Sequence, residues 1–284
     1  MRDTRSRVRP RFVALAAAAA FVPALIVPAI ANAATLYGSG SSAAQPYMVQ
    51  LFNAYHKLHK NISFHYNPDG GNAGVSDVLA GRSAFAIQTA APVPADKGTR
   101  FVKLFLDAVC VDVNSKNSLS NISVEKLADI FGGITNPYDW ASVGGNLGSA
   151  SIAPIGRNST AGLYTFFNSA VLKPYGLSQD EPLVAEETSD GLVAQAVGDN
   201  TDAIGYVGLA HSKERGEHTV LVNHAGCNAK AIKAERYPLY HFDWGVLPLN
   251  KPSKTVEQFF DWVQKSKAAG KIINKAGAVA AFNA

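Results

Sequence analysis

Apolar and polar residues alternate in blocks from Ala34 to about Asp112. Short apolar runs typical of strands are separated by segments in which apolar residues recur every three or four positions, as in helices that bury one face. The predicted strands are 35–37, 62–66, 83–89 and 108–113, and the predicted helices between them are 43–58 and 72–80. Strands that alternate with helices indicate a largely parallel sheet with helices on its faces, so the pattern predicts an α/β fold.

A second block with the same alternation follows. Its predicted elements are a helix capped by Ser120 or Ser123, a strand at 152–155, a helix that carries Leu163, Phe166, Phe167 and Val171, a helix near 189–197 and a strand at 203–207. An extended segment at 236–249 and two amphipathic helices, 255–266 and 270–277, close the chain. This block is typical of a second α/β lobe.

Glycines and small polar residues precede three of the predicted helices. They stand at 38–42, 69–72 and 156–162, and the third stretch also contains Arg157, with Ser159 or Thr160 as the expected N-cap. Free backbone N–H groups at a helix start attract negative charge, and a guanidinium can grip two oxygens of an oxyanion. Ligands of such sheets bind beyond the carboxyl ends of the strands, so the three turns predict one anion pocket that needs no metal.

The first 33 residues have the features of a secretory signal peptide. Five arginines precede an apolar run from Phe12 to Ile30, and Ala31-Asn32-Ala33 provides a small-residue cleavage site before Ala34. We therefore expect cleavage near Ala33 and Ala34 and an exported protein, periplasmic or secreted.

The positive net charge of the chain belongs to this segment. Five of the 26 basic residues and one of the 22 acidic residues lie in the first 33 positions, which leaves 21 of each. A general affinity for nucleic acid or anionic lipid is therefore not expected, because no surplus of Lys or Arg remains. The remaining 251 residues suit one large domain or two lobes.

Two cysteines, Cys110 and Cys227, are present in a chain predicted to reach an oxidising compartment. A disulfide could persist there, whereas two buried thiols would also fit the sequence. The spacing itself suggests neither redox catalysis nor a zinc site.

Four motifs in order resemble the substrate-binding proteins of phosphate-type ABC transporters. Gly38–Pro46 resembles the family's opening G-x-G-A-T-F-P-x-P, and residues 70–75 resemble G-S-G-x-G-I. Residues 127–136 are similar to L-x-x-I-F-x-G-x-I-x-x-W, and residues 203–207 repeat A-I-G-Y-V. The resemblance extends over essentially the whole chain after the signal peptide.

This resemblance implies a two-lobed type II periplasmic-binding-protein fold, in which each lobe is a mixed sheet flanked by helices. Lobe 1 would comprise residues 34–112 plus 236–284 and lobe 2 residues 113–235, joined by two crossover strands with the ligand buried between them. It also implies a monomer that binds phosphate or a similar oxyanion for a membrane ABC permease, with no catalytic residue, cofactor, metal or nucleic acid partner.

The family's pocket carries over unevenly. Arg157 matches the binding arginine, Gly162 the helix-start glycine and Ser42 the threonine of the first loop, while Gly71 stands in place of a serine. The predicted ligand-binding residues are Ser41, Ser42, Ala43, Gly71, Asn72, Gln88, Thr89, Arg157, Ser159, Thr160, Ala161 and Gly162.

One departure concerns the proton that phosphate keeps near neutral pH. The family accepts it with the carboxylate of D-F-G-A-S-D, whereas residues 84–89 here read Ala-Phe-Ala-Ile-Gln-Thr. Gln88 or Thr89 could accept a hydrogen bond more weakly, or Asp69 could substitute from the neighbouring loop.

Competing interpretations remain open. Arg157 could form a surface salt bridge worth under about 1 kcal/mol. If it binds the ligand, its replacement by Ala would weaken binding without changing the melting temperature of the ligand-free protein. The chain could be an exported phosphate-ester hydrolase that uses Ser41, Ser42 or Ser159, although no G-x-S-x-G elbow is present. It could also share the fold and have lost phosphate binding in favour of another ligand or a protein partner.

Overall fold

The computed structural model describes residues 33–134, 138–180, 182–214 and 216–280, and the structural statements below concern these residues. The predicted signal peptide lies outside them, apart from Ala33. Within the described ranges, no helix is both long and apolar enough to cross a membrane.

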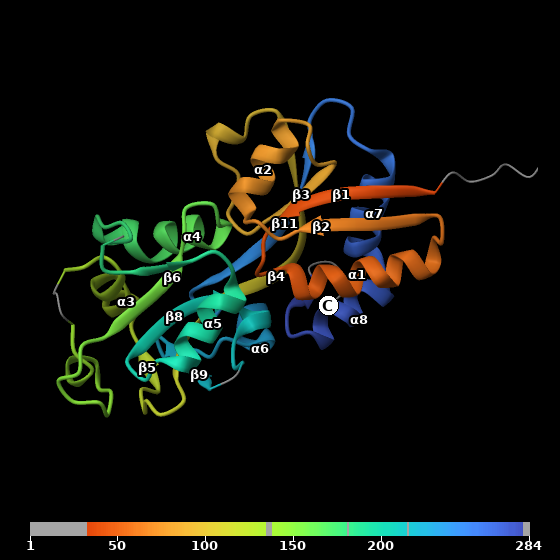
Figure 1. Ribbon diagram of the computed structural model, residues 1–284. Coiled ribbons are helices and arrows are strands. Elements are labelled where there is room, and N and C mark those ends of the chain that lie inside the picture. The colour runs from red at the N-terminus through yellow and green to blue at the C-terminus, as the bar shows by residue number, and fades with distance from the viewer. Residues whose placement is uncertain (1–32, 135–137, 181, 215, 281–284) are drawn as a thin grey trace, which may run out of the picture. The chain divides into compact units, whose positions relative to one another are not determined.

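One long strand, β4 (Thr99–Asn114), belongs to both halves of the sheet. Its first part pairs antiparallel with β11 (Tyr240–Pro248), and its last residues pair antiparallel with β8 (Ala203–Gly208). The strand order is β2-β1-β3-β11-β4-β8-β6-β7. Figure 1 shows β4 and β11 between the strands that carry the first and second halves of the alternating pattern.

The other strands follow the predicted alternation. They are β1 (Ala34–Gly40), β2 (Ile62–Asn67), β3 (Phe85–Gln88), β5 (Asn121–Ile122), β6 (Ala153–Arg157), β7 (Ala185–Glu187), β9 (Glu217–Thr219), β10 (Leu221–Val222) and β12 (Val279–Ala280). β1 lies parallel to β2 and β3, and β6 lies parallel to β7 and β8. The carboxyl ends of β1, β2 and β6 therefore carry the turns that the sequence singled out.

Eight α-helices are described. They are α1 (Gln45–Leu58), α2 (Gly71–Leu79), α3 (Val124–Phe131), α4 (Gly162–Phe167), α5 (Asp190–Asp199), α6 (Ala229–Lys233), α7 (Lys254–Lys265) and α8 (Lys267–Lys275). Shorter helical turns are a π-helical turn at Asn168–Leu172 and 3-10 turns at Pro94–Asp96, Ala141–Val143, Lys173–Tyr175 and Leu209–His211. Ser123, not Ser120, caps α3, because its side chain accepts the N–H of Lys126.

Two expectations about these elements were wrong. The N-cap of α4 is Ala161, with no side-chain cap, whereas Ser159 or Thr160 had been expected. The strand predicted at 108–113 is the end of β4, which begins at Thr99. Arg100 and Lys103 interrupt the apolar pattern of its first half, where the strand is only partly buried, so the sequence shows only the fully buried end.

The two larger of three clusters of buried hydrophobic residues lie in the sheet's two halves, and the small third cluster packs Val75 and Val78 of α2 on β3 and β11. One packs α1, α7 and α8 on the strands of the first half and includes Phe85, Phe105 and Phe259. The other includes Trp140 and Tyr206. It also takes in the end of β4 and residues 237 and 239, which the sequence placed in lobe 1. The two clusters support a division into two lobes, and its boundaries stay a proposal.

The two cysteines form a disulfide. Cys110 on β4 and Cys227 before α6 are 117 residues apart, and their Cα atoms are separated by 5.6 Å. Of the two arrangements that the sequence allowed, the structure has the paired one. In the chain-entropy model, a cross-link that closes a loop of this length raises the free energy of the unfolded chain by about 4 to 5 kcal/mol. The bond therefore stabilises the folded protein.

Candidate functional site

The three glycine-bearing turns meet beside the end of β3. A Cβ atom at Gly71, the first residue of α2, would overlap the side-chain oxygen Oε1 of Gln88. The same is true at Gly162, the first residue of α4. A side chain at either position would force the Gln88 carboxamide to move, so glycine at both lets the two helix starts lie against this side chain as it stands.

The Gln88 carboxamide occupies this meeting point. Its Oε1 accepts the backbone N–H groups of Thr89 at 2.9 Å and Ala90 at 3.2 Å. Its Nε2 donates to Oδ1 of Asn72 at 2.9 Å. An uncharged oxygen of the protein itself thus lies where the sequence predicted an oxygen of the anion.

Asn72 links α2 to the turn before α4. Its Nδ2 donates to the carbonyl oxygen of Ser159 at 2.9 Å and to Oγ1 of Thr165 at 2.8 Å. The backbone N–H groups of Asn72 and Ala73 donate to the carbonyl oxygen of Thr160 at 3.0 and 3.3 Å. These first N–H groups of α2 are the donors that a helix start offers to an anion, and a backbone carbonyl satisfies them here.

Arg157, the last residue of β6, is held from several sides and is only 1% exposed. Its Nη1 donates to Oδ2 of Asp190, and to Oγ of Ser42 at 3.0 Å. Its Nε and Nη2 donate to the carbonyl oxygens of Glu187 and Thr188 at 3.1 and 2.9 Å. These contacts use four of the five guanidinium N–H groups, which leaves one on Nη2 for a further acceptor.

Asp190 is the partner that the sequence analysis missed. It is the first residue of α5 and fully buried, and its Oδ2 accepts the Ser42 hydroxyl at 2.7 Å while Oδ1 accepts the Gly208 N–H at 2.9 Å. Ser189 before it is a recognisable N-cap, so the sequence marks a helix start here. It contains no sign that this carboxylate meets an arginine 33 residues earlier.

The burial of this pair revises two interpretations of Arg157. It is not a surface salt bridge, because both side chains are almost completely shielded from water. Removing one partner would leave an uncompensated buried charge, which typically costs 3 to 5 kcal/mol. The expectation that Arg157→Ala leaves the melting temperature unchanged is therefore withdrawn.

The remaining predicted residues divide into two groups. Ser41, Ser42, Ala43 and Ala161 are buried. Ser159 and Thr160 bring only their backbone to it, since both are exposed and the Thr160 hydroxyl lies 2.6 Å from Oδ1 of Asn158. The hydroxyl contact that we expected from Ser159 is thus absent from this arrangement of the described residues.

A second group of buried polar side chains lies behind Ser41 and Thr89. The Thr89 hydroxyl is 3.1 Å from that of Ser41 and donates to Oδ1 of Asp243 at 3.3 Å. Asp107, also fully buried, accepts the hydroxyl of Tyr47 at 3.2 Å. Neither carboxylate was among the predicted residues. Asp69, the suggested substitute, instead accepts the side-chain N–H of Asn67 at 2.9 Å.

Burial decides the charges of this group. Loss of water raises the pKa of Asp107 to about 7, and the pKa of Asp243 is well above its ordinary value because of burial and the nearby Asp107. Burial lowers the pKa of His241 to about 4, so this imidazole is neutral at pH 7. Arg157 therefore supplies the positive charge of the site.

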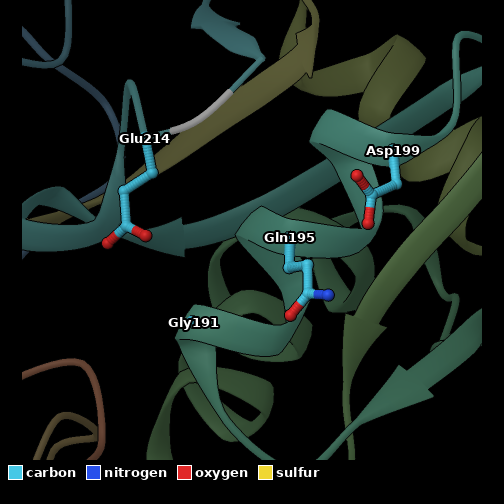
Figure 2. Close-up of a pocket in the computed structure, with 4 residues that line it drawn as sticks. All are labelled: Gly191, Gln195, Asp199 and Glu214. Atoms are coloured by element: carbon cyan, nitrogen blue, oxygen red, sulfur yellow. The ribbon is translucent and has the colours of Figure 1, made fainter.

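A cavity of about 210 Å³ lies elsewhere, along α5 (Figure 2). It is lined by Gly191, Gln195, Asp199 and Glu214, and Figure 2 shows the two carboxylates on different segments. Two acidic side chains make it a poor place for an anion. Among the described residues, no group of three or more His, Cys, Asp or Glu is arranged to hold a metal ion.

A family model described as the PBP superfamily domain matches residues 28–267. The chain belongs to the PBP superfamily. The α/β fold expected from the sequence is confirmed, and so is the resemblance to the substrate-binding proteins of phosphate ABC transporters.

Two curated relatives of this PBP superfamily member are staphylococcal proteins. It is 24% identical over 266 residues to the phosphate-binding protein PstS of Staphylococcus epidermidis, a match that covers 86% of this chain and 78% of the relative. It is 28% identical over 182 residues to the protein of the same name from Staphylococcus haemolyticus. That match covers 60% of this chain and only 55% of the relative.

Solved structures with the same fold include two transporter components. A putative phosphate ABC transporter substrate-binding protein with bound phosphate, from Clostridium perfringens, aligns with a TM-score of 0.78 and 20% identity. The alignment covers 87% of this chain and 99% of that one. An ABC-type phosphate transport receptor from Vibrio cholerae aligns with a TM-score of 0.68 and 21% identity, over 86% and 99% of the two chains. At these identities the likeness establishes the fold.

The buried pair of this PBP superfamily member is tested by a double-mutant cycle. We expect Arg157→Met and Asp190→Asn each to lower the free energy of unfolding of the ligand-free protein by about 3 to 5 kcal/mol, because each leaves one buried charge without its partner. The double variant should lose less than the sum of the two, by about 1 to 3 kcal/mol. Urea unfolding measures all four proteins, and strictly additive losses would contradict the pairing.

A pH series tests the buried carboxyls. The folded protein keeps a proton on Asp107 up to about pH 7, whereas the unfolded chain releases it near pH 4, so this group makes stability fall as pH rises between those values. The slope approaches about 1.4 kcal/mol per pH unit. Asp107→Asn removes this effect and also removes a neighbouring group that raises the pKa of Asp243. The free energy of unfolding of the wild type minus that of the variant should therefore decline from pH 4 to pH 7 and level off above pH 7. His241 titrates in both proteins, and parallel curves would contradict this account.

Proposed function

We propose that this protein captures phosphate, or a closely similar tetrahedral oxyanion, between two lobes and delivers it to a membrane ABC permease. The observation that carries the proposal is that α2 and α4 both begin against Gln88 Oε1, while Ser41 contacts the next residue, Thr89, and Ser42 contacts Arg157. The names of the relatives and of the phosphate-bound structural neighbour support phosphate as the anion.

Binding would exchange protein oxygens for phosphate oxygens. One phosphate oxygen takes the place of Gln88 Oε1 on the N–H groups of Thr89 and Ala90, and separation of the lobes releases the α2 donors from the Thr160 carbonyl. The free N–H on Nη2 of Arg157 adds a charge-assisted contact. Hydrogen bonds of this kind contribute about 1.5 to 3 kcal/mol each, so a few give micromolar affinity.

The Asp190 carboxylate has a positioning role in this scheme. It neutralises Arg157 and fixes the guanidinium plane together with the Glu187 and Thr188 carbonyls. Binding then depends mainly on oriented N–H dipoles, and the anion meets a donor set that needs little rearrangement.

A binding role fits the site better than hydrolysis. The Ser42 hydroxyl donates to Asp190 and accepts from Arg157, and no histidine in the described ranges bonds to a hydroxyl of Ser41 or Ser42. Of the atoms of these two serines, His211 contacts the Ser42 carbonyl oxygen, at 3.2 Å, and its other ring nitrogen contacts Glu214. We further propose that the protein is exported, periplasmic or secreted, acts as a monomer and has no nucleic acid partner, as its sequence indicates.

One observation favours a second candidate function. Gln88 and the Thr160 carbonyl satisfy the donors that an anion would use, so the fold could have lost its ligand and serve another partner. The two functions differ in whether these contacts yield to phosphate.

Isothermal titration of phosphate into the purified protein, refolded from denaturant to remove bound anion, separates them. We expect heat from phosphate in the wild type and at least tenfold weaker binding in Gly162→Ala, because the added methyl group enters the space of the proposed phosphate oxygen. The matched control is Gly191→Ala in the first turn of α5, where the nearest atoms to an added Cβ are 4.0 Å away. A wild type that binds no phosphate would favour the second candidate, and equal affinity in the two variants would move the site elsewhere.

A further inference from the structure

The Gln88 side chain fills the place where two helices begin. Its Oε1 would overlap a Cβ atom at Gly71, the first residue of α2, and a Cβ atom at Gly162, the first residue of α4. Gln88 is only 3% exposed, and it is the last residue of β3. A polar side chain is therefore buried at the position that the proposed function gives to a phosphate oxygen.

The orientation of this carboxamide is fixed from both ends. Its Oε1 faces the backbone N–H groups of Thr89 and Ala90, which can only donate. Its Nε2 faces Oδ1 of Asn72, and the Asn72 amide cannot be turned over, because its Nδ2 donates to the carbonyl oxygen of Ser159. The carboxamide is thus held as a ligand would be, with an oxygen that accepts two N–H groups and a nitrogen that donates to α2.

A neutral carboxamide and an anion have different advantages at this place. Hydrogen bonds to a charged acceptor are about twice as strong as those to a neutral one, which favours phosphate. The carboxamide is attached to the site, so it competes at a fixed local concentration however dilute the solution is. The phosphate concentration that fills half of the sites therefore rises with the share of molecules in which Gln88 occupies the place.

We propose that Gln88 is a tethered competitor for the anion, which lowers the apparent affinity of the site and so tunes the protein to abundant phosphate. This inference rests on the proposed function. Phosphate binds to those molecules in which the side chain has moved away from the N–H groups. If Gln88 occupies the place in about nine of ten molecules, the apparent dissociation constant is about tenfold larger than that of the site without the competitor.

The competitor can move without a change in the sheet. The backbone of Gln88 pairs with that of Trp244 on β11, which fixes the strand but not the end of the side chain. Rotation about the side-chain bonds of glutamine carries the carboxamide to another staggered position while the strand keeps its partner. The overlap with added Cβ atoms at Gly71 and Gly162 likewise concerns the far end of a flexible side chain.

The test compares Gln88→Ala with the wild type by isothermal titration of phosphate, each protein refolded from denaturant to remove bound anion. We expect the dissociation constant of the variant to be about tenfold smaller, because the competitor is gone. The matched control is Gln195→Ala, which shortens an exposed glutamine of α5 in the same way. It should keep the wild-type dissociation constant within about twofold.

Rate constants separate a competitor from an ordinary contact residue. Gln88 acts before phosphate binds, so its removal should raise the association rate constant about tenfold and leave the dissociation rate constant unchanged. Substitutions in a binding surface mostly change the dissociation rate constant instead. Stopped-flow fluorescence measures both, and Trp244, which pairs with Gln88, is a nearby reporter.

A second variant guards against a loss of folding in Gln88→Ala. Gln88→Leu keeps an apolar side chain in the buried space but offers no acceptor to the N–H groups of Thr89 and Ala90. It should also bind phosphate more tightly than the wild type, again through faster association.

The possible results are distinguishable. Unchanged or weaker phosphate binding in both Gln88 variants would overturn the inference and leave the proposed function intact, because Gln88 would then be a structural residue or a contact of the ligand. Tighter binding through slower dissociation alone would overturn it as well. A failure of the wild type and of both variants to bind phosphate would contradict the proposed function itself, and the inference with it.

Discussion

The buried contact between Arg157 and Asp190 is the interaction on which the candidate site depends. It joins the end of β6 to the start of α5, and the hydroxyl of Ser42 reaches it from the start of the α1 segment, 115 residues away from Arg157 in the chain. An unpaired guanidinium at this depth would be costly. Paired, it is held in one orientation with one N–H available.

The glycines impose a second constraint on the same place. Side chains at Gly71 and Gly162 would overlap Gln88, so the two helix starts and the Gln88 carboxamide fit together as they do because both residues lack a Cβ atom. At Gly70, φ is +110°, and a Cβ there would overlap the Thr160 carbonyl. The donors for an anion and the carbonyl and amide oxygens that replace it thus come from the same turns. This explains how one arrangement can be satisfied without ligand and still suit an oxyanion.

The sequence predicts the parts of this site whose signals are local. The alternation of strands and helices, a capping serine at Ser120 or Ser123, the helix near 189–197 and the position of Arg157 between a strand and a helix all depend on neighbours within a few residues. The α/β fold and the resemblance to the binding-protein family could be predicted for that reason. The first half of β4 was missed because its polar positions hide a strand that tertiary pairing stabilises.

The partners across the fold could not be predicted. Asp190 is 33 residues from Arg157, and Asp243 is 154 residues from Thr89, and nothing in either local pattern indicates the contact. The exposure of the Ser159 and Thr160 side chains was missed for a related reason, since Ala161, and not Ser159 or Thr160, is the N-cap of α4. One sequence shows which residues can donate or accept, whereas their directions follow from packing.

The most direct test of the central claim is a crystal structure of the protein with phosphate bound. The account predicts that a phosphate oxygen replaces Gln88 Oε1 as the acceptor for the N–H groups of Thr89 and Ala90, with Nη2 of Arg157 in contact and the Arg157–Asp190 pair retained. Phosphate bound elsewhere, with the Gln88 carboxamide still in place between Gly71 and Gly162, would contradict it.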